Sequence, residues 1–273
     1  MTRVLAPEEL LSVTLDPELD TPHTHAALAG LPEWFSTGAG EPAAVHAIGG
    51  PGWTTRLGTV LGLRPRAVLL GSVAPAPPET VRALAELADR NGVPVIVDSP
   101  WALHPTTAEL APHLRKAAAG AAQIELFTAA DTPPLRALVD QLALAAVTVG
   151  QVTELRLHRL DDHGHVATAR CVGVPVSFSG AGTGSGAHEA RLVVRGAGEQ
   201  WRLGFGDPHC ARPVAAVRID DTGEHSHPTH YETAHRAAWG HTHAAAVHGT
   251  TPVYGLRELA AQLALLPDTV HFS

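Results

Sequence analysis

The fold is decided by residues 67–97, which read AVLLG at 67–71, ETVRALAELADRN at 79–91 and VPVIV at 93–97. The first and last pieces are almost wholly apolar, which is typical of strands that are buried on both faces. The middle piece carries valine, alanine and leucine at helical spacing, and Asn91-Gly92 ends the helix. A strand, a helix and a strand of these lengths predict a right-handed βαβ unit and therefore a parallel sheet.

The same alternation extends over the first half of the chain. Apolar runs predict further strands at 10–15, 44–48 and 123–127. Helical spacing predicts helices at 22–31, 54–63 and 106–118. We therefore expect residues 1–127 to form an α/β domain with a Rossmann-like parallel sheet.

The pattern changes after residue 130, where one helix at 134–145 leads into a series of longer strands. These strands are predicted at 151–160, 166–178, 189–194, 200–205 and 214–219. Strand following strand predicts an antiparallel or mixed sheet. With closing helices at 231–248 and 256–265, residues 128–273 are expected to form an α+β domain with a large mixed or antiparallel sheet.

The composition excludes several classes of protein. With 45% hydrophobic and 17% charged residues among 273, the chain can bury a substantial core. The net charge of -8 argues against a nucleic-acid binder, which needs a basic face. No run approaches the ~18 apolar residues that span a membrane, and the N-terminus lacks the pattern of a signal peptide. We therefore expect a cytoplasmic protein that binds neither nucleic acid nor membrane.

Three segments, taken in order, resemble the Gfo/Idh/MocA oxidoreductase family. Gly92-Val93-Pro94-Val95-Ile96-Val97-Asp98-Ser99-Pro100 is similar to that family's strand ending in Glu-Lys-Pro. Val149-Gly150-Gln151-Val152 resembles its entry to the large sheet, and residues 231–259 resemble its closing helices with a Gly-x-x-Pro turn. The resemblance covers nearly the whole chain and implies a two-domain oxidoreductase fold.

The resemblance also implies a nicotinamide dinucleotide site, which the sequence departs from. The family's G-x-G-x-x-G turn corresponds here to residues 16–25, which contain no glycine but carry Asp16, Glu18 and Asp20. Carboxylates repel a diphosphate, and side chains block the close backbone approach that glycine permits. We therefore expect the dinucleotide motif to be lost and no NAD(P) to be used, with Asp20 and Thr21 serving as helix caps.

The catalytic motifs of the family depart in the same direction. Its Glu-Lys-Pro lysine corresponds to Ser99, which cannot act as a cationic proton donor. Its Asp-x-x-x-His helix, between the first two strands of the large sheet, has no recognised counterpart, since residues 161–165 read as a hairpin tip. The sequence therefore predicts that the family's usual hydride transfer is absent.

Candidate site residues follow the strand that ends at residue 97. Asp98, Ser99, Trp101 and His104 are expected at the carboxyl edge of the sheet, where open α/β sheets bind ligands. Asp98 with His104 would form a pair for proton transfer, with Ser99 as a further catalytic candidate and Trp101 contacting the substrate. A helix-capping role for Asp98 is the alternative.

Histidines gather before the penultimate predicted helix. His225 and His227 would share one face of an extended segment, and His230 would join them from the following turn. Three imidazoles suit Zn or Fe(II). The alternative is a polar loop without metal. His230 is also a candidate catalytic residue, and Tyr231 a candidate for substrate binding.

These features predict a small-molecule enzyme of specialised bacterial biosynthesis that uses non-redox acid/base chemistry, such as cyclisation, isomerisation or elimination. Two alternatives remain: a non-catalytic partner subunit of an intact dehydrogenase, and a divergent NAD(P)-dependent oxidoreductase. The strands at 151–219 also carry apolar residues on both faces in places, as at 171–176. We therefore expect a homodimer, or a heterodimer with a related subunit, formed through the C-terminal sheet.

Overall fold

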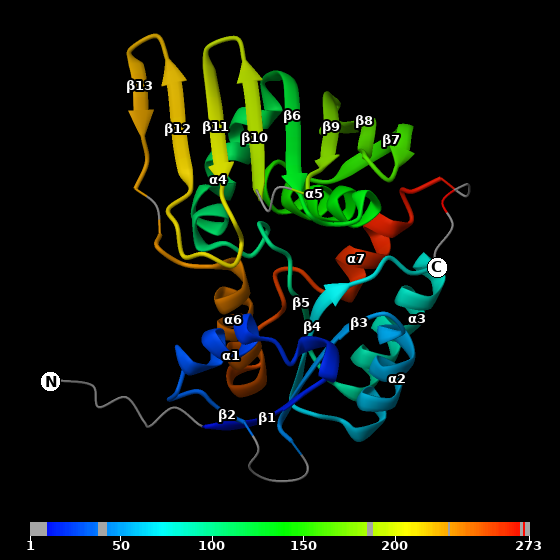
Figure 1. Ribbon diagram of the computed structural model, residues 1–273. Coiled ribbons are helices and arrows are strands. Elements are labelled where there is room, and N and C mark those ends of the chain that lie inside the picture. The colour runs from blue at the N-terminus through cyan, green and yellow to red at the C-terminus, as the bar shows by residue number, and fades with distance from the viewer. Residues whose placement is uncertain (1–9, 38–42, 185–187, 229, 268–269, 271–273) are drawn as a thin grey trace, which may run out of the picture.

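The computed structural model describes residues 10–37, 43–184, 188–228, 230–267 and 270. Within them the chain forms two sheets, one above the other in Figure 1, with helices between and beside them. The elements of the first half are β1 (Leu11–Leu15), a 3-10 turn (Pro17–Leu19), α1 (Pro22–Ala29), β2 (Phe35–Thr37), β3 (Val45–Gly50), α2 (Trp53–Leu63), β4 (Ala67–Val73), α3 (Pro78–Asn91), β5 (Val95–Val97) and α4 (Pro105–Ala119). The remaining elements are β6 (Ala121–Ala130), α5 (Pro134–Thr148), β7 (Val152–Asp161), β8 (Gly164–Cys171), β9 (Val174–Gly182), β10 (Glu189–Gly196), β11 (Glu199–Phe205), β12 (Ala215–Asp220), β13 (Gly223–Ser226), α6 (Ala234–His248) and α7 (Leu256–Leu263).

The smaller sheet is parallel throughout, in the order β2-β1-β3-β4-β5 for the described residues. The chain moves outward from β1 to β2, returns to β3 and then moves the other way through β4 and β5. The strand order therefore reverses between β1 and β3, and such a switch point is where open α/β sheets bind ligands. The predicted Rossmann-like sheet is confirmed.

Helices cover both faces of this sheet. In Figure 1, α1 and α6 lie on one side, and α2 and α3 lie on the other. Val68, Leu69 and Leu70 of β4 are accordingly fully buried, which explains the unbroken apolar run at this place in the sequence. Helix α3 ends at Gly92, whose φ of +67° is a left-handed conformation that glycine adopts without steric cost.

The larger sheet is mixed. Its order is β13-β12-β11-β10-β6-β9-β8-β7 within the described residues, with β6 and β9 parallel and the other pairs antiparallel. Helices α4 and α5 cover the face that points toward the parallel sheet (Figure 1). Side chains on that face are buried, and those on the opposite face are partly or fully exposed. The predicted α+β arrangement is confirmed.

Several elements differ from the sequence-based prediction. The strand predicted at 123–127 belongs to β6 in the middle of the larger sheet, not to the parallel sheet. The strand predicted at 166–178 is two strands, because Val172 and Gly173 form a turn with φ values of +52° and +81°. Strands β2 and β13 are too short for periodicity to reveal them.

The chain crosses between the two halves of the molecule more than once. The chain passes from the parallel to the mixed sheet between β5 and β6, and it returns when α6 and α7 pack against β4 and β5. The predicted boundary between a domain of residues 1–127 and a domain of residues 128–273 therefore stays a prediction. None of the helices in the described residues is both long and apolar enough to cross a membrane.

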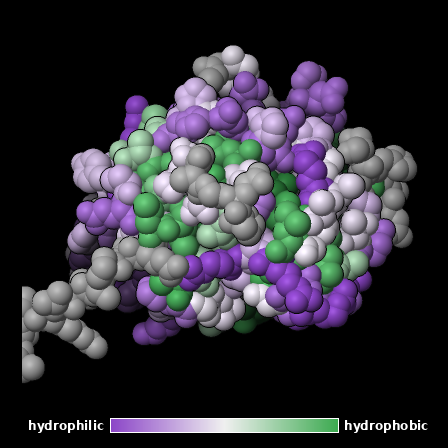
Figure 2. Space-filling model, turned by 90° about the horizontal axis from the view of Figure 1, so that it is seen from below, coloured by the Kyte–Doolittle hydropathy of each residue, from purple (hydrophilic) through white to green (hydrophobic). Residues whose placement is uncertain are grey.

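The lower surface of the molecule, opposite the mixed sheet, is shown in Figure 2. Hydrophobic atoms gather in the middle of this face, between hydrophilic groups and grey atoms. Among the described residues the most exposed large hydrophobic side chains are few: Leu10, Leu63, Val166, Val172, Tyr231 and Val253.

A buried polar network joins α5 to the mixed sheet. The Nε2–H of His165 in β8 donates to Oε1 of Gln141 at 2.8 Å, and Nε2 of Gln141 donates to Thr128 and to the carbonyl of Ser179. A Cβ at Gly180 would collide with the His165 ring, so Gly180 makes room for this network. Burial lowers the pKa of His165 to about 4.

This histidine makes a pH-dependent contribution to stability. The unfolded chain takes up the proton near pH 6.5, whereas folded His165 resists it until about pH 4. Its contribution is therefore complete above pH 6.5 and is lost as the pH falls toward 4, by about 3 kcal/mol. We expect urea unfolding of the wild type to lose more free energy between pH 7 and pH 4 than that of His165→Gln. Equal losses in the two proteins would contradict this assignment.

Candidate functional site

A cleft of about 530 Å³ opens at the carboxyl ends of β3, β4 and β5. Its opposite wall comes from the end of β6, the first turns of α5, the loop after β11 and the first turn of α6. A volume of this size is typical of small-molecule sites. The polar side chains along it are Thr21, His23, Thr24, Ser72, Asp98, Trp101, Asp131, Thr132, Arg136, Asp140, His188, His209 and His235.

Asp98 and His235 form a partly buried pair in the wall of this cleft. Asp98 follows β5, and His235 is the second residue of α6, so the two meet across 137 residues of sequence. Nδ1 of His235 donates a hydrogen bond to Oδ2 of Asp98. Burial by itself lowers the pKa of His235, but the Asp98 carboxylate outweighs it, and the net pKa is raised. The Asp98 carboxylate therefore favours the protonated form of His235.

His104, the predicted partner of Asp98, has a different role. Its Nδ1 accepts a hydrogen bond from the backbone N–H of Thr106 and caps α4, and its Nε2 donates to the carbonyl of Glu232 at 3.1 Å. Both ring nitrogens are thus used, and burial lowers its pKa. The structure replaces the expected Asp98–His104 pair with Asp98–His235.

The two neighbours of Asp98 that were singled out are placed differently. Trp101 lines the cleft, and its contact with substrate stays a prediction. Ser99 is fully buried, and its side chain does not line the cleft. Ser99 can therefore reach a ligand only if the backbone after β5 moves.

His230 and Tyr231 lie outside the cleft. Nε2 of His230 pairs with Glu109 of α4 at 2.9 Å, on an exposed surface. Tyr231 is 76% exposed. The backbone N–H of His230 also donates to Oγ1 of Thr106 at the start of α4, at 3.3 Å.

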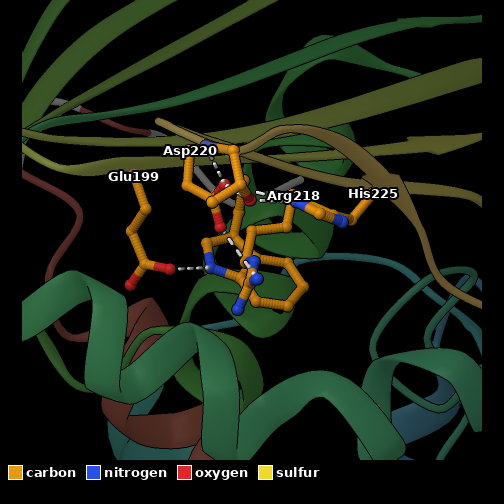
Figure 3. A network of polar contacts seen from close by, with 6 residues as sticks. Glu199, Arg218, Asp220 and His225 are labelled. Carbon is orange, nitrogen blue, oxygen red and sulfur yellow. Dashed lines mark hydrogen bonds and ion pairs between the residues drawn. The ribbon is translucent and has the colours of Figure 1, made fainter.

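The three histidines proposed as metal ligands are held by different partners. His225 in β13 pairs with Asp220 at 3.2 Å, and Asp220 also binds Arg218 at 2.8 Å (Figure 3). The His227 ring packs against Trp201 with centroids 4.8 Å apart, while His230 turns to Glu109. In the part of the chain that the structure describes, no three His, Cys, Asp or Glu side chains are arranged to hold a metal.

The turn after β1 carries the three carboxylates that replace the glycine motif. Asp16 pairs with Arg56 of α2 at 2.5 Å, and Asp20 pairs with His25. Thr21 caps α1, as predicted, by accepting from the N–H of Thr24. Asp16 and Asp20 therefore each have a partner within or beside this turn.

Glu18 and Leu19 of this turn pack over glycines near the carboxyl ends of β3 and β4. A Cβ at Gly49 would lie 2.7 Å from the Leu19 side chain, and one at Gly71 would lie 3.2 Å from it. Glu18 packs against Gly50 in the same way. The glycines thus make room for the chain's own turn.

Helix α5 was missed as a source of functional residues. It corresponds to the helix predicted at 134–145, and it lies between β6 and β7. Asp140 of α5 lines the cleft. Strand β7 is followed directly by β8 through the turn at 162–163, and the loss of the family's Asp-x-x-x-His helix stays a prediction.

Asp140 is the second titratable group in the cleft with a shifted ionisation. Burial raises its pKa to about 6, although Arg136 counteracts this, and the Asp98 charge adds to the rise. Part of the Asp140 carboxyl is therefore protonated near neutral pH. Periodicity could not single out this residue, because it lies in a helix whose other residues are mostly buried and apolar.

Two further histidines meet at the cleft. The ring of His23, from α1, stacks on that of His209, from the loop after β11, with centroids 4.2 Å apart. Burial, and then the neighbouring His23, lower the pKa of His209. No signal in the sequence predicts this contact, because the two histidines lie far apart in the sequence.

Comparison with known proteins identifies the fold. No family model matches the sequence, and neither does any curated protein sequence. Among solved structures, KijD10, a 3-ketoreductase from Actinomadura kijaniata in complex with NADP, superposes with a TM-score of 0.66 and 11% identity over 93% of this chain and 86% of that chain. UDP-N-acetylglucosamine 3-dehydrogenase GnnA from Acidithiobacillus ferrooxidans gives 0.62 and 12%, over 92% and 85%. A dehydrogenase from Chromobacterium violaceum gives 0.69 and 13%, over 94% and 93%.

The chain has the fold of these oxidoreductases. This supports the resemblance to the Gfo/Idh/MocA family at the level of the scaffold, and the loss of the family's motifs stays a prediction. The expectation of a scaffold without NAD(P) is overturned by KijD10, which carries NADP on the same fold. A turn without glycine is therefore not sufficient ground for excluding the cofactor.

The pairing of Asp98 with His235 can be tested without a substrate. In Asp98→Asn the carboxylate is lost and burial remains, so we expect the pKa of His235 to fall below its ordinary value. Imidazole NMR titration measures this directly. Asp162→Asn, in the exposed hairpin tip, is the matched control and should leave the His235 titration unchanged. An unaltered titration in Asp98→Asn would contradict the pairing.

Proposed function

We propose that this chain is a small-molecule enzyme on an oxidoreductase-like scaffold, in which Asp98 and His235 transfer a proton to or from a hydroxyl or carbonyl group of a sugar-like substrate. The observation that carries the proposal is the partly buried carboxylate–imidazole pair in the wall of the cleft. KijD10 is a 3-ketoreductase and GnnA a UDP-N-acetylglucosamine 3-dehydrogenase, which supports a sugar derivative as the substrate class.

The moving proton is the one shared by Nδ1 of His235 and Oδ2 of Asp98. A carbonyl that is being reduced or enolised develops negative charge on oxygen, and the pair supplies the proton that neutralises it. In the reverse direction the pair accepts the proton of a hydroxyl. Positioned proton transfer of this kind typically contributes 10²–10⁴-fold to a rate. Asp140 on the facing wall is a second group that can hold a proton near neutral pH.

A nicotinamide dinucleotide fits this cleft along α1. Helix N-termini bind phosphate, and Thr21 and His23 at the start of α1 line the cleft together with Gly50 and Pro51 after β3. These residues would hold the diphosphate, and the bound group would supply the hydride. Since Glu18 and Leu19 cover the glycines, the group would be held from α1 rather than through a glycine cradle.

Non-redox acid/base chemistry is the second candidate. It is favoured by one observation, the packing of Leu19 and Glu18 over Gly49, Gly50 and Gly71 at the switch point of the sheet. The pair of Asp98 and His235 can also carry out an isomerisation or elimination, in which a proton is removed from carbon next to a carbonyl and returned elsewhere. Specialised bacterial biosynthesis is the setting we propose for either chemistry.

We also propose that two subunits associate through the open face of the mixed sheet. Helices α4 and α5 cover only one face, and Val193 and Val217 lie partly exposed on the other. The turn at Val172 removes one of the segments thought to be apolar on both faces. A stable interface nevertheless needs only ~800 Å² from each subunit.

Catalysis is tested with NADPH and a panel of 3-keto sugars linked to TDP or UDP. We expect NADPH absorbance to decrease with the wild type, and the rate to fall about 100-fold or more in Asp98→Asn and His235→Gln. His158→Gln is the control, because His158 is exposed on the mixed sheet and bonded to Thr168. Full activity in Asp98→Asn would exclude the pair from the chemistry.

The non-redox candidate is distinguished in the same panel without NADPH. We expect it to give deuterium uptake from heavy water into the sugar, dependent on His235. Uptake that is equal in His235→Gln would exclude this route.

The association is tested by light scattering at micromolar concentration. We expect a mass twice that of the 28.5 kDa chain. Val193→Asp, on the open face, should give the monomer because it buries a charge in the interface, whereas Leu63→Asp, on the exposed end of α2, should not. A strict monomer in the wild type would contradict the dimer and weaken the partner-subunit alternative.

A further inference from the structure

Arg136 contacts both walls of the cleft. It is the third residue of α5, and its side chain is mostly buried, at 19% exposure. Nη1 donates to the carbonyl of Val73 at the end of β4 at 2.9 Å, and Nε donates to Oδ2 of Asp140 at 3.3 Å. One guanidinium thus links a helix of the mixed-sheet half to a strand of the parallel sheet.

The end of β4 is irregular where Arg136 holds it. Ser72 has a φ of +45°, a left-handed conformation that is strained for a residue with a side chain. The register between β3 and β4 shifts at the same place, so that Gly50 pairs with Val73. Because the ladder is interrupted here, the contact with Arg136 fixes a backbone segment that also lines the cleft.

The carboxyl group of Asp140 is surrounded by titratable groups. Arg136 approaches it from its own helix, Asp98 with its partner His235 from the parallel sheet, and Tyr254 from the loop before α7. Glu258 of α7 contributes to the same field around Tyr254. In this group Arg136 is the permanent cation nearest to the carboxyl, so it holds the carboxylate in one orientation.

We propose that Arg136 is the positioning residue of the cleft: its guanidinium fixes Asp140 and the end of β4 together, so that Asp140 faces the Asp98–His235 pair across the substrate. This rests on the proposed function for the role of Asp140, but the geometry of Arg136 can be measured in the resting protein. The role requires a fork with several N–H donors, because two acceptors on different elements are bound at once.

The test is a carbon NMR titration of Asp140, assigned with Asp140→Asn, in protein without ligand. We expect Arg136→Gln to raise the pKa of Asp140 by about one unit, because the cation is lost. Arg136→Lys keeps the cation and should restore most of that pKa. Arg191→Gln, which breaks the exposed pair with Glu189, is the control and should leave the titration unchanged. An unchanged titration in Arg136→Gln would overturn the proposal.

Hydrogen exchange gives a second reading that does not depend on Arg136→Gln folding. Lysine offers one point of attachment, so Arg136→Lys should speed exchange of the Ser72, Val73 and Ala74 amides about tenfold, corresponding to about 1.4 kcal/mol. Equal exchange in the wild type and Arg136→Lys would also overturn the proposal. Neither measurement needs turnover. A negative result for Arg136 is therefore distinguishable from a negative result for the proposed Asp98–His235 chemistry.

Discussion

The hydrogen bond between His235 and Asp98 ties the carboxyl end of β5 to the first turn of α6, and much of the site depends on it. A carboxylate at the end of a buried strand loses solvation, and it stays charged only when a cation or donor compensates it. His235 supplies that compensation from α6, a helix that follows all strands of the mixed sheet in the sequence. In the folded chain α6 also packs against β4 and β5, and the loop after β11 lines the same cleft.

Charges in and around the cleft are compensated in pairs, each with a different consequence. Asp16 with Arg56 compensates charge in the turn after β1. Arg136 pairs with Asp140 in its own helix and also donates to the carbonyl of Val73, and this second contact joins the two halves of the molecule. Buried histidines without a carboxylate partner, such as His165, have lowered pKa values because burial disfavours the imidazolium. His235 differs because Asp98 reverses that effect. The cleft therefore contains an imidazole whose pKa is raised and a carboxyl whose pKa is raised to about 6, a combination suited to proton transfer.

The scaffold explains how a chain with 11% identity to KijD10 retains its fold. Unbroken apolar strands, helices on both faces of the parallel sheet and a mixed sheet with one covered face are requirements of burial, which many sequences satisfy. The turn after β1 is under different constraints, because it lies at the switch point of the parallel sheet. Here Leu19 and Glu18 occupy the space over the glycines, which is why we propose that a dinucleotide would be held from α1. Fold and ligand contacts thus vary separately on this scaffold.

The sequence by itself determined the order and type of most elements, because an apolar run such as 67–71 or a helix such as 79–91 reflects burial on a local period. It also placed Asp98 and Trp101 correctly at the carboxyl edge, since parallel strands share that edge. The sequence did not reveal short strands such as β2 or the turn at Val172, because two or three residues are too few to show a periodic pattern of apolar residues. Which side chains meet was decided by the tertiary structure alone. His235 pairs with Asp98, and His104 caps α4 instead. The reason is that α6 packs beside β5 only in the folded chain, so residues that lie far apart in the sequence become neighbours there.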